Sequence, residues 1–283
     1  VPCTEERLAA QGATVAPPLY GVWMYDPRDR TQRPVVPPSE GFAYSEVVAL
    51  QPQALPPVLL DRVAGVDFDS DLEAEGVGIL DIRSVYDIDG VDAAPGGIAA
   101  LADPRRTTAA QRPARFLRIE KAVSLPDDEV RDFDNSAFGV SAAFGMREIL
   151  GYAPVEPDGS VRVKVPADVP FAISVLDGDG RRISPRHQNW LQVRAGEELR
   201  CNGCHDPASG ESHGREDLFA PAYAGAATTG QPFPNTNPAL FADFGETMAQ
   251  VRARISCQTD CEALLLSPDL VYEDVWTDPA TAG

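Results

Sequence analysis

The chain has 283 residues, a hydrophobic fraction of 43% and a formal net charge of −19. That length allows one large domain or two smaller ones with their own cores, and the acidity argues against nucleic acid as a partner. No apolar run comes near the roughly 18 residues that a membrane-spanning helix needs, so we expect no membrane span. The chain opens on Val1 rather than methionine, and we expect it to be a processed piece or part of a longer protein.

Proline sets the character of residues 1–60, which show little periodic pattern. Within them, "LYGVWMYDP" predicts a strand that ends in a turn at Asp26-Pro27. The segment "ALQPQALPPVLLD" predicts an extended linker, because proline removes backbone donors and fixes φ. We therefore treat residues 1–60 as a strand and linker region that is separate from the rest of the chain.

Residues 61–200 carry the alternation of apolar and polar residues that is typical of half-buried strands. Strands are predicted in "GVGILDIRSVYDIDG", "ARFLRIEKAVSL", "VRVKVPA" and "VPFAISVL". Turns containing Asp-Gly at 156–160 and 177–180 separate the later strands. Strands at this spacing predict a mainly β fold, with a β-sandwich-like domain over residues 61–200 and a few short helices.

Local patterns assign four further segments. A short helix is predicted near 97–103, and one or two helical turns are predicted in "SAAFGMREILGY" (141–152), ended by Gly151. The segment "NWLQVRAGEELRC" (189–201) predicts a hairpin that turns around Gly196. The helical spacing of apolar residues in "ALFADFGETMAQVRARI" (239–255) predicts the clearest helix of the chain.

The last region, residues 201–283, combines a loop-rich segment with that helix and a pair of closely spaced cysteines. Cys257 and Cys261 are near enough in sequence to close a short disulfide loop, and such a bond would place the protein outside the cytoplasm. Cys3 is left over among the five cysteines.

Aspartates gather in four loops: 67–71, 87–92, 132–135 and 177–180. Such loops make calcium a candidate ligand. The EF-hand pattern fails when started at Asp67, because its glycine and glutamate positions hold Leu72 and Gly78. Since Asp, Asn and Gly also favour turns in their own right, calcium stands beside a purely turn-forming role.

The string Cys201-Asn202-Gly203-Cys204-His205 is a C-x-x-C-H motif, the spacing at which haem c is attached. Two thiols at this spacing can each bond one vinyl group on the same edge of the porphyrin. The histidine that follows can then ligate the iron. We therefore predict one covalent haem c, with Cys201 and Cys204 as tethers and His205 as an axial ligand.

Three other chemistries use part of the same residues. A redox-active C-x-x-C is expected in a thioredoxin-like βαβ setting, whereas the surroundings predicted here are a hairpin and a polar loop. A zinc site would combine Cys201 and Cys204 with His213, or with Cys257 and Cys261, and needs no histidine directly after the motif. A plain disulfide with a bystander histidine is the third alternative.

An electron-carrying haem iron needs a second axial ligand, which histidine or methionine can supply. His213 is our first choice, because an extended eight-residue link from His205 reaches about 26 Å, enough to pass round the haem edge. His187 is the alternative, since a hairpin about Gly196 would place it opposite the end of the motif. Further options are Met24, Met146 and Met248. Water or an open position is the last.

The strands and the motif together resemble a known family. The succession "PVEPDGSVRVKVPADVPFAISVLDGDGRRI", followed by "NWLQVRAGEELRCNGCH", is similar to the haem-bearing middle domain of the hydrazine synthase alpha subunit family. The segments "GVGILDIRSVYDIDG" and "ARFLRIEKAV" resemble earlier strands of that domain, so the resemblance spans roughly residues 76–205. It implies a secreted or periplasmic multidomain protein, in which residues 1–60 would be the end of a preceding β-propeller.

The resemblance does not bring the family's activity with it. In hydrazine synthase the corresponding haem is a reaction centre with a tyrosine ligand just after the motif, whereas this chain has Ser209 where that tyrosine would stand. The family's reaction also needs a further haem and partner subunits, and this chain has one haem motif.

The sequence thus predicts an exported, periplasmic or extracellular monohaem c-type cytochrome domain that transfers electrons through a bis-histidine haem. Its partners would be a redox protein or an extracellular electron acceptor, within a larger multidomain or multi-subunit assembly. The acidic surface would favour a partner with a basic patch. Two alternatives stay open: a haem redox enzyme with an open iron position, and a haem-bearing structural part of an extracellular assembly.

Overall fold

The protein is seen in a computed structural model, which describes residues 20–50, 52, 63, 65–134, 145–185, 187, 189–206, 208, 220–234, 236, 240–257 and 262–277. The chain divides into two compact units, Val1–Leu60 and Asp61–Gly283. In the described parts of the chain, no helix is both long and apolar enough to span a bilayer.

In the described residues of the first unit, β1 (Val22–Asp26) and β2 (Thr31–Val36) form a β-hairpin. The Asp26 carboxylate accepts a hydrogen bond of 2.9 Å from the Arg28 amide, which stabilises the turn predicted at this place. No described residue of this unit is buried, and Trp23 is about half exposed at 49%. The described hairpin therefore has no apolar core of its own.

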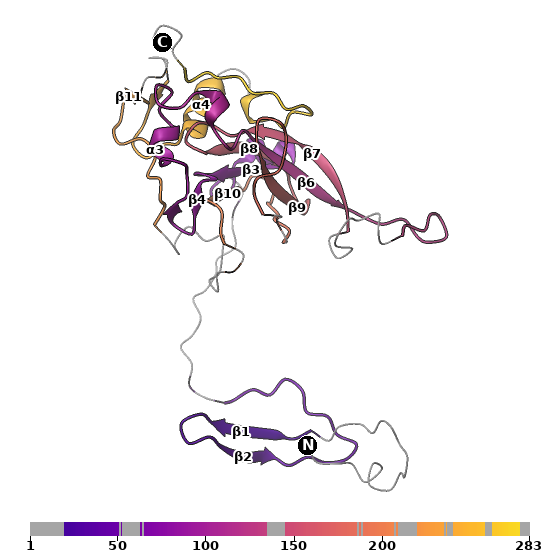
Figure 1. Ribbon diagram of the computed structural model, residues 1–283. Coiled ribbons are helices and arrows are strands. Elements are labelled where there is room, and N and C mark those ends of the chain that lie inside the picture. Colours follow the sequence, from indigo (N-terminus) through magenta and orange to yellow (C-terminus); the bar gives the residue numbers. More distant parts are fainter. Residues whose placement is uncertain are drawn as a thin grey trace. The chain divides into compact units, whose positions relative to one another are not determined.

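The second unit is built on two three-stranded sheets (Figure 1). In the first sheet β3 (Val77–Ile82) is central, with β8 (Val161–Pro166) antiparallel on one side and β10 (Glu198–Cys201) parallel on the other. In the second sheet β6 (Phe116–Val123) is central, and both β7 (Met146–Pro154) and β9 (Phe171–Leu176) run antiparallel to it.

Both sheets contribute side chains to a single main core. Its most deeply buried members are Leu80, Leu117, Ile119, Val155, Val161, Val165 and Phe171. The strand β8 shows the cause, because its buried and half-buried residues alternate along its whole length. Alternation buries one face of each such strand, and the shared core confirms the β-rich, sandwich-like fold expected from the sequence.

Short elements surround the sheets. They are α2 (Ser70–Glu75), β4 (Asp87–Ile88), β5 (Val91–Asp92), α3 (Ile98–Leu101), the 3-10 helix η1 (Ala109–Gln111), β11 (Gln231–Pro232), β12 (Phe241–Ala242), α4 (Met248–Ser256) and the 3-10 helix η4 (Glu262–Leu264). The helix expected near 97–103 is α3. A second core cluster packs around α4 and includes Met248, Val251 and the fully buried Trp276.

The helix α4 is shorter than the predicted segment 239–255. It begins at Met248, because Thr247 caps it and its Oγ accepts a hydrogen bond from the Gln250 amide. The buried turn 156–160 accepts hydrogen bonds from backbone amides at the start of the helix. Asp158 accepts from the Met248 amide at 2.8 Å. Phe241 and Ala242, earlier in the predicted segment, instead form β12, so the apolar spacing did not mark the start of the helix.

The prediction of helical turns in 141–152 is wrong where the structure describes it. Residues 146–154 form β7, which pairs with β6 from Met146 to Pro154. Gly151 stands next to an irregularity in this pairing, with φ +152°. A β-carbon on Gly151 would lie 2.8 Å from both Leu266 Cβ and Ser267 O. This glycine admits the close approach of a later segment to the sheet, rather than ending a helix.

The predicted hairpin over 189–201 is also wrong. The turn itself exists, since Gly196 has φ +77° and the Glu197 amide donates to Arg194 O at 3.1 Å. Its two arms, however, pair with different strands. Leu191 forms an isolated bridge with Phe171 of β9, whereas β10 runs parallel to β3. The chain between these two pairings therefore passes from the second sheet to the first.

Candidate functional site

The strand β10 delivers the C-x-x-C-H motif to the end of the first sheet. Its last residue, Cys201, is in register with Ile82, the last residue of β3. Because the two strands are parallel, the segments that follow them leave the sheet at the same end and continue side by side. Residues 83–89 therefore lie against the turn formed by 201–205.

Backbone hydrogen bonds fix this turn along both of its sides. The Arg83 amide donates to Cys201 O at 2.8 Å, and the Cys204 amide donates to Asp87 O at 2.8 Å. The Asp89 amide donates in turn to Cys204 O at 3.1 Å. The spacing and orientation of the two cysteines are thus set by segment 83–89, and not by the motif alone.

Gly203 is required for this close approach. A β-carbon at this position would lie 2.3 Å from Asp87 O and 2.7 Å from Ser84 O, both of which are backbone atoms. No side chain larger than hydrogen fits there without a shift of one of the two segments. The second free position of the motif is therefore restricted by packing.

Asp87 organises the surroundings of the turn although it lies outside the motif. Its side chain is buried and accepts hydrogen bonds from the Gly90 amide at 2.8 Å and the Ala222 amide at 2.7 Å. Burial raises the pKa of Asp87, and the two amides oppose that shift. Sequence reasoning placed this residue only in an acidic loop. Asp87 contacts segments more than a hundred positions later in the chain, and the sequence around Asp87 shows no pattern that predicts these contacts.

The two thiols lie at the margin of the main core. Both cysteines pack against the buried cluster that the two sheets share. Burial, together with the neighbouring Cys201 and Asp87, raises the pKa of the Cys204 thiol to about 12. A thiol with that pKa is protonated at neutral pH and is a poor nucleophile or redox group. No disulfide joins Cys201 to Cys204 in the part of the chain that the structure describes.

The structure brings two of the three histidines together. The ring centres of His205 and His187 are 6.4 Å apart, and the ring planes are inclined at 65°. Burial lowers the pKa of His187, so this imidazole is neutral at pH 7, the form that can ligate a metal. His187 was expected near the motif, and it is, although the hairpin that was to place it there does not exist.

Some predicted site residues cannot be assigned a position. His213, Cys3 and Cys261 lie outside the described residues. The sixth-ligand role of His213 and the disulfide between Cys257 and Cys261 therefore stay predictions.

In the described acidic loops, aspartate side chains accept hydrogen bonds from backbone amides of the same loop or of the helix that follows it. Asp69 caps α2 by accepting from the Asp71 and Leu72 amides, and Asp177 accepts from the Asp179 and Arg181 amides. Within the described ranges, no three His, Cys, Asp or Glu side chains gather closely enough to hold a metal ion by themselves. These contacts agree with the turn-forming role of the loops.

An ion-pair network holds β10 to the rest of its sheet. Arg162 of β8 donates to both carboxylate oxygens of Glu198, at 2.8 and 3.1 Å, and also to Asp81 of β3. Arg200 donates to Glu198 at 2.8 Å. Burial opposes the ionisation of Glu198, but its bonds to Arg162 and Arg200 prevail and lower its pKa to about 2. Charged groups thus fix the strand that carries the motif.

The donor set fits a covalently bound haem. Cys201 and Cys204 pack against the apolar cluster, and an uncharged thioether is at home there just as the protonated thiol is. The turn holds both sulfur atoms at the same edge of the sheet, and His205 follows directly. Two thiols and an adjacent imidazole are the groups that tether and ligate a c-type haem.

Residues 114–206 match the family model of the hydrazine synthase alpha subunit middle domain. We call them the middle-domain region; it runs from just before β6 to just past His205. Hydrazine synthase subunit alpha of Kuenenia stuttgartiensis is 33% identical over 72 residues, which are 25% of this chain and 9% of that protein. A solved structure of Kuenenia stuttgartiensis hydrazine synthase aligns at 22% identity, covering 49% of this chain and 19% of that chain, with a TM-score of 0.34.

The resemblance inferred from the sequence is confirmed for the middle-domain region. This region contains the whole C-x-x-C-H turn and His187, whereas β3, against which β10 packs, lies outside it. The chain corresponds to a small part of the hydrazine synthase subunit, so the likeness concerns one domain and not the whole relative.

Proposed function

We propose that this chain is an exported monohaem c-type cytochrome domain that binds one haem covalently through Cys201 and Cys204 and transfers electrons. The observation that carries the proposal is the C-x-x-C-H turn at the end of β10, anchored by backbone hydrogen bonds to segment 83–89. Its place inside the middle-domain region adds support. A location outside the cytoplasm is part of the same proposal, and the likeness to a hydrazine synthase subunit supports membership of a multi-subunit assembly.

The residues of this chain would hold and orient the haem. Cys201 and Cys204 would form the two thioether bonds, and His205 would bind the iron. When bound, a haem supplies one-electron oxidation and reduction at its iron. A dithiol redox centre is the competing use of these cysteines, but it needs a thiolate near neutral pH, which the buried surroundings of Cys204 oppose.

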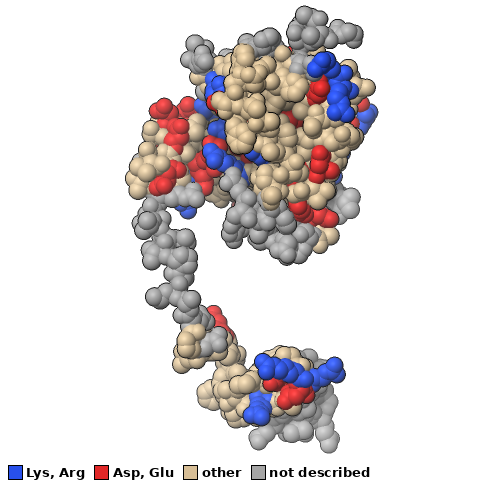
Figure 2. All heavy atoms as spheres, turned by 90° about the vertical axis from the view of Figure 1, so that its left-hand side faces the viewer, with Lys and Arg blue, Asp and Glu red and all other residues tan. Residues whose placement is uncertain are grey.

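Charge points to the kind of redox partner. The chain carries a net charge of −19, and on the face in Figure 2 acidic groups stand in several separate places with basic groups beside them. No single basic patch dominates that face. A partner protein with a basic surface would be attracted at low salt, and its association would slow as salt screens the charges.

The first experiment asks whether haem is attached. The chain is produced in a bacterial host together with c-type haem maturation proteins and examined by intact mass under denaturing conditions. We expect the mass of one haem above that of the polypeptide and a reduced-minus-oxidised spectrum of a c-type cytochrome. The Cys201→Ser/Cys204→Ser variant should lose both signals, whereas the control Cys257→Ser should keep them. A wild-type protein without covalent haem would refute the proposal.

The second experiment separates an electron carrier from a haem enzyme. Reduced protein is mixed with carbon monoxide and followed by absorbance. An iron with both axial positions filled should bind carbon monoxide slowly, because one ligand must leave first. Rapid binding would mean an open iron position and would replace the carrier by a haem redox enzyme.

A further inference from the structure

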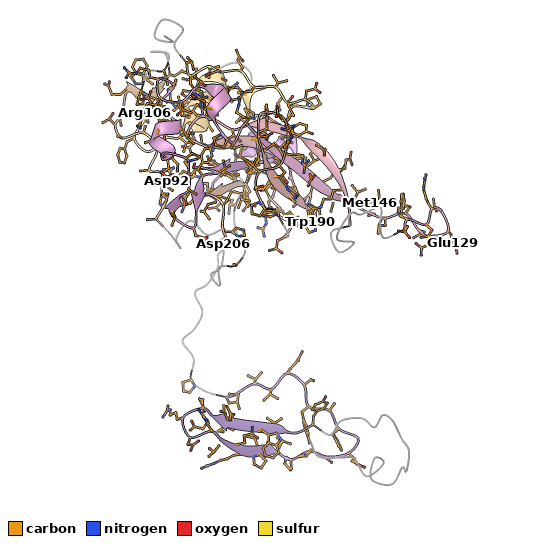
Figure 3. All side chains as sticks on the ribbon, viewed as in Figure 1. Asp92, Arg106, Glu129, Met146, Trp190 and Asp206 are labelled. Atoms are coloured by element: carbon orange, nitrogen blue, oxygen red, sulfur yellow. The ribbon has the colours of Figure 1, made fainter. Side chains whose placement is uncertain are left out.

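His187 and His205 lie on segments that follow strands of different sheets. His205 follows β10 of the first sheet directly. His187 lies on the loop that follows β9 of the second sheet, between Ile183 and Leu191. Although neither residue is in a regular element, their rings approach to 6.4 Å between centres. Figure 3 shows Trp190, near His187 in the chain, and Asp206, next to His205, along the same margin of this unit.

Both ends of the His187 loop are fixed on β9. At one end the Ile183 amide donates to Val175 O at 2.9 Å. At the other end Leu191 and Phe171 exchange two backbone hydrogen bonds, of 2.7 and 2.8 Å. The loop therefore leaves the edge of the second sheet and returns to the same strand, which restricts where His187 can lie.

A side-chain contact fixes the same loop further. The guanidinium of Arg147, on β7, stacks over the Trp190 ring at 4.6 Å. Arg147 also forms an ion pair with Glu120 of β6 at 3.3 Å, and both side chains are largely buried. The loop is thus held directly by β9 and β7, while Glu120 of β6 fixes Arg147, so the second sheet restricts the separation of the two histidines.

That separation fits two ligands of one metal. A metal–imidazole bond is about 2 Å long and the bonding nitrogen lies about 1 Å from its ring centre, so two imidazoles on opposite sides of one iron have ring centres roughly 6 Å apart. The 65° between the planes is also compatible with axial ligation, because each ring can rotate about its own metal–nitrogen bond.

We propose that His187 supplies the second axial nitrogen of the haem iron, opposite His205. This inference rests on the proposed covalent haem. It assigns the role to a residue fixed on the second sheet, rather than to His213 in the segment after the motif. The iron would then join the two sheets through one imidazole from each.

The test compares His187→Ala with the matched control His213→Ala, since each removes one imidazole near the motif. Visible absorption and electron paramagnetic resonance of the oxidised proteins report the spin state. We expect wild type and His213→Ala to be low-spin, and His187→Ala to be high-spin and to bind carbon monoxide rapidly once reduced. Added imidazole should restore the low-spin spectrum of His187→Ala. A low-spin His187→Ala protein would overturn the inference.

A second variant covers the case in which His187→Ala does not fold. His187→Met keeps a ligand of similar length, and it should remain low-spin while its midpoint potential rises, because a thioether favours the reduced iron. An unchanged potential in folded His187→Met would overturn the inference. Haem content distinguishes the two proposals: a wild type without covalent haem defeats both, whereas a haem-loaded His187→Ala protein that stays low-spin defeats only the assignment of His187.

Discussion

Replacing Gly203 by alanine tests how tightly the C-x-x-C-H turn is held. The added β-carbon would lie 2.3 Å from Asp87 O, 2.6 Å from Asp87 Cβ and 2.7 Å from Ser84 O. None of these atoms can move aside by rotation of a side chain. The variant must therefore displace the turn from segment 83–89, or displace that segment from the sheet.

The expected loss has two contributions. One extra methyl group in a closely packed site costs about 1–3 kcal/mol, and loss of the 2.8 Å hydrogen bond from the Cys204 amide to Asp87 O adds about 1 kcal/mol. We expect Gly203→Ala to lower the free energy of unfolding by about 2–4 kcal/mol.

Urea unfolding followed by tryptophan fluorescence measures the change. Gly178→Ala is the control, because its β-carbon would meet nothing closer than 3.8 Å and its site is exposed. That control should stay within about 0.5 kcal/mol of wild type. Equal unfolding midpoints for the two variants would refute the packing argument for Gly203.

Two further predictions concern the supports of the site. The ordinary pKa of Glu198 is 4.5 and its bonds to Arg162 and Arg200 lower it to about 2, so its contribution to stability is full above pH 4.5 and is lost as the pH falls towards 2. Unfolding of wild type and Glu198→Gln at a series of pH values should therefore show a stability difference that shrinks over this range; a constant difference would contradict it. Asp158→Ala should cost about 3 kcal/mol, because it leaves the Met248 amide at the start of α4 buried without its acceptor. Circular dichroism during thermal unfolding measures this loss, and an unchanged melting temperature would show that Asp158 does not support the helix.

Local patterns were enough to predict the strands β6 and β8. The alternation in "VRVKVPA" and "ARFLRIEKAVSL" predicted β8 and β6, and their buried faces are the apolar ones. The prediction for the segment of β7 was wrong because its composition also suits a helix. Pairing with β6, a tertiary contact, decided the outcome.

The candidate site was predictable in its chemistry but not in its surroundings. Cys201, Cys204 and His205 are identified by a spacing that can be read directly. Asp87, by contrast, reaches the motif through a parallel strand pairing between β3 and β10, which leaves no periodic signal in either segment. His187 was expected near the motif through a hairpin, whereas two anchors on β9 place it there. The prediction that His187 lies near the motif was therefore right, but the hairpin on which it was based does not exist.

The parallel pairing of β10 with β3 also sets an order of events in biosynthesis. Contacts between segments so distant in sequence form late in folding, because a long loop must close first. Docking of β10 packs Cys204, half-buried, against the margin of the core and raises the pKa of its thiol from 9.0 to about 12, which lowers the small thiolate fraction further. Under the proposed function, the thiols therefore react with haem most readily before β10 docks, and the docked turn then holds the attached haem at the end of the sheet.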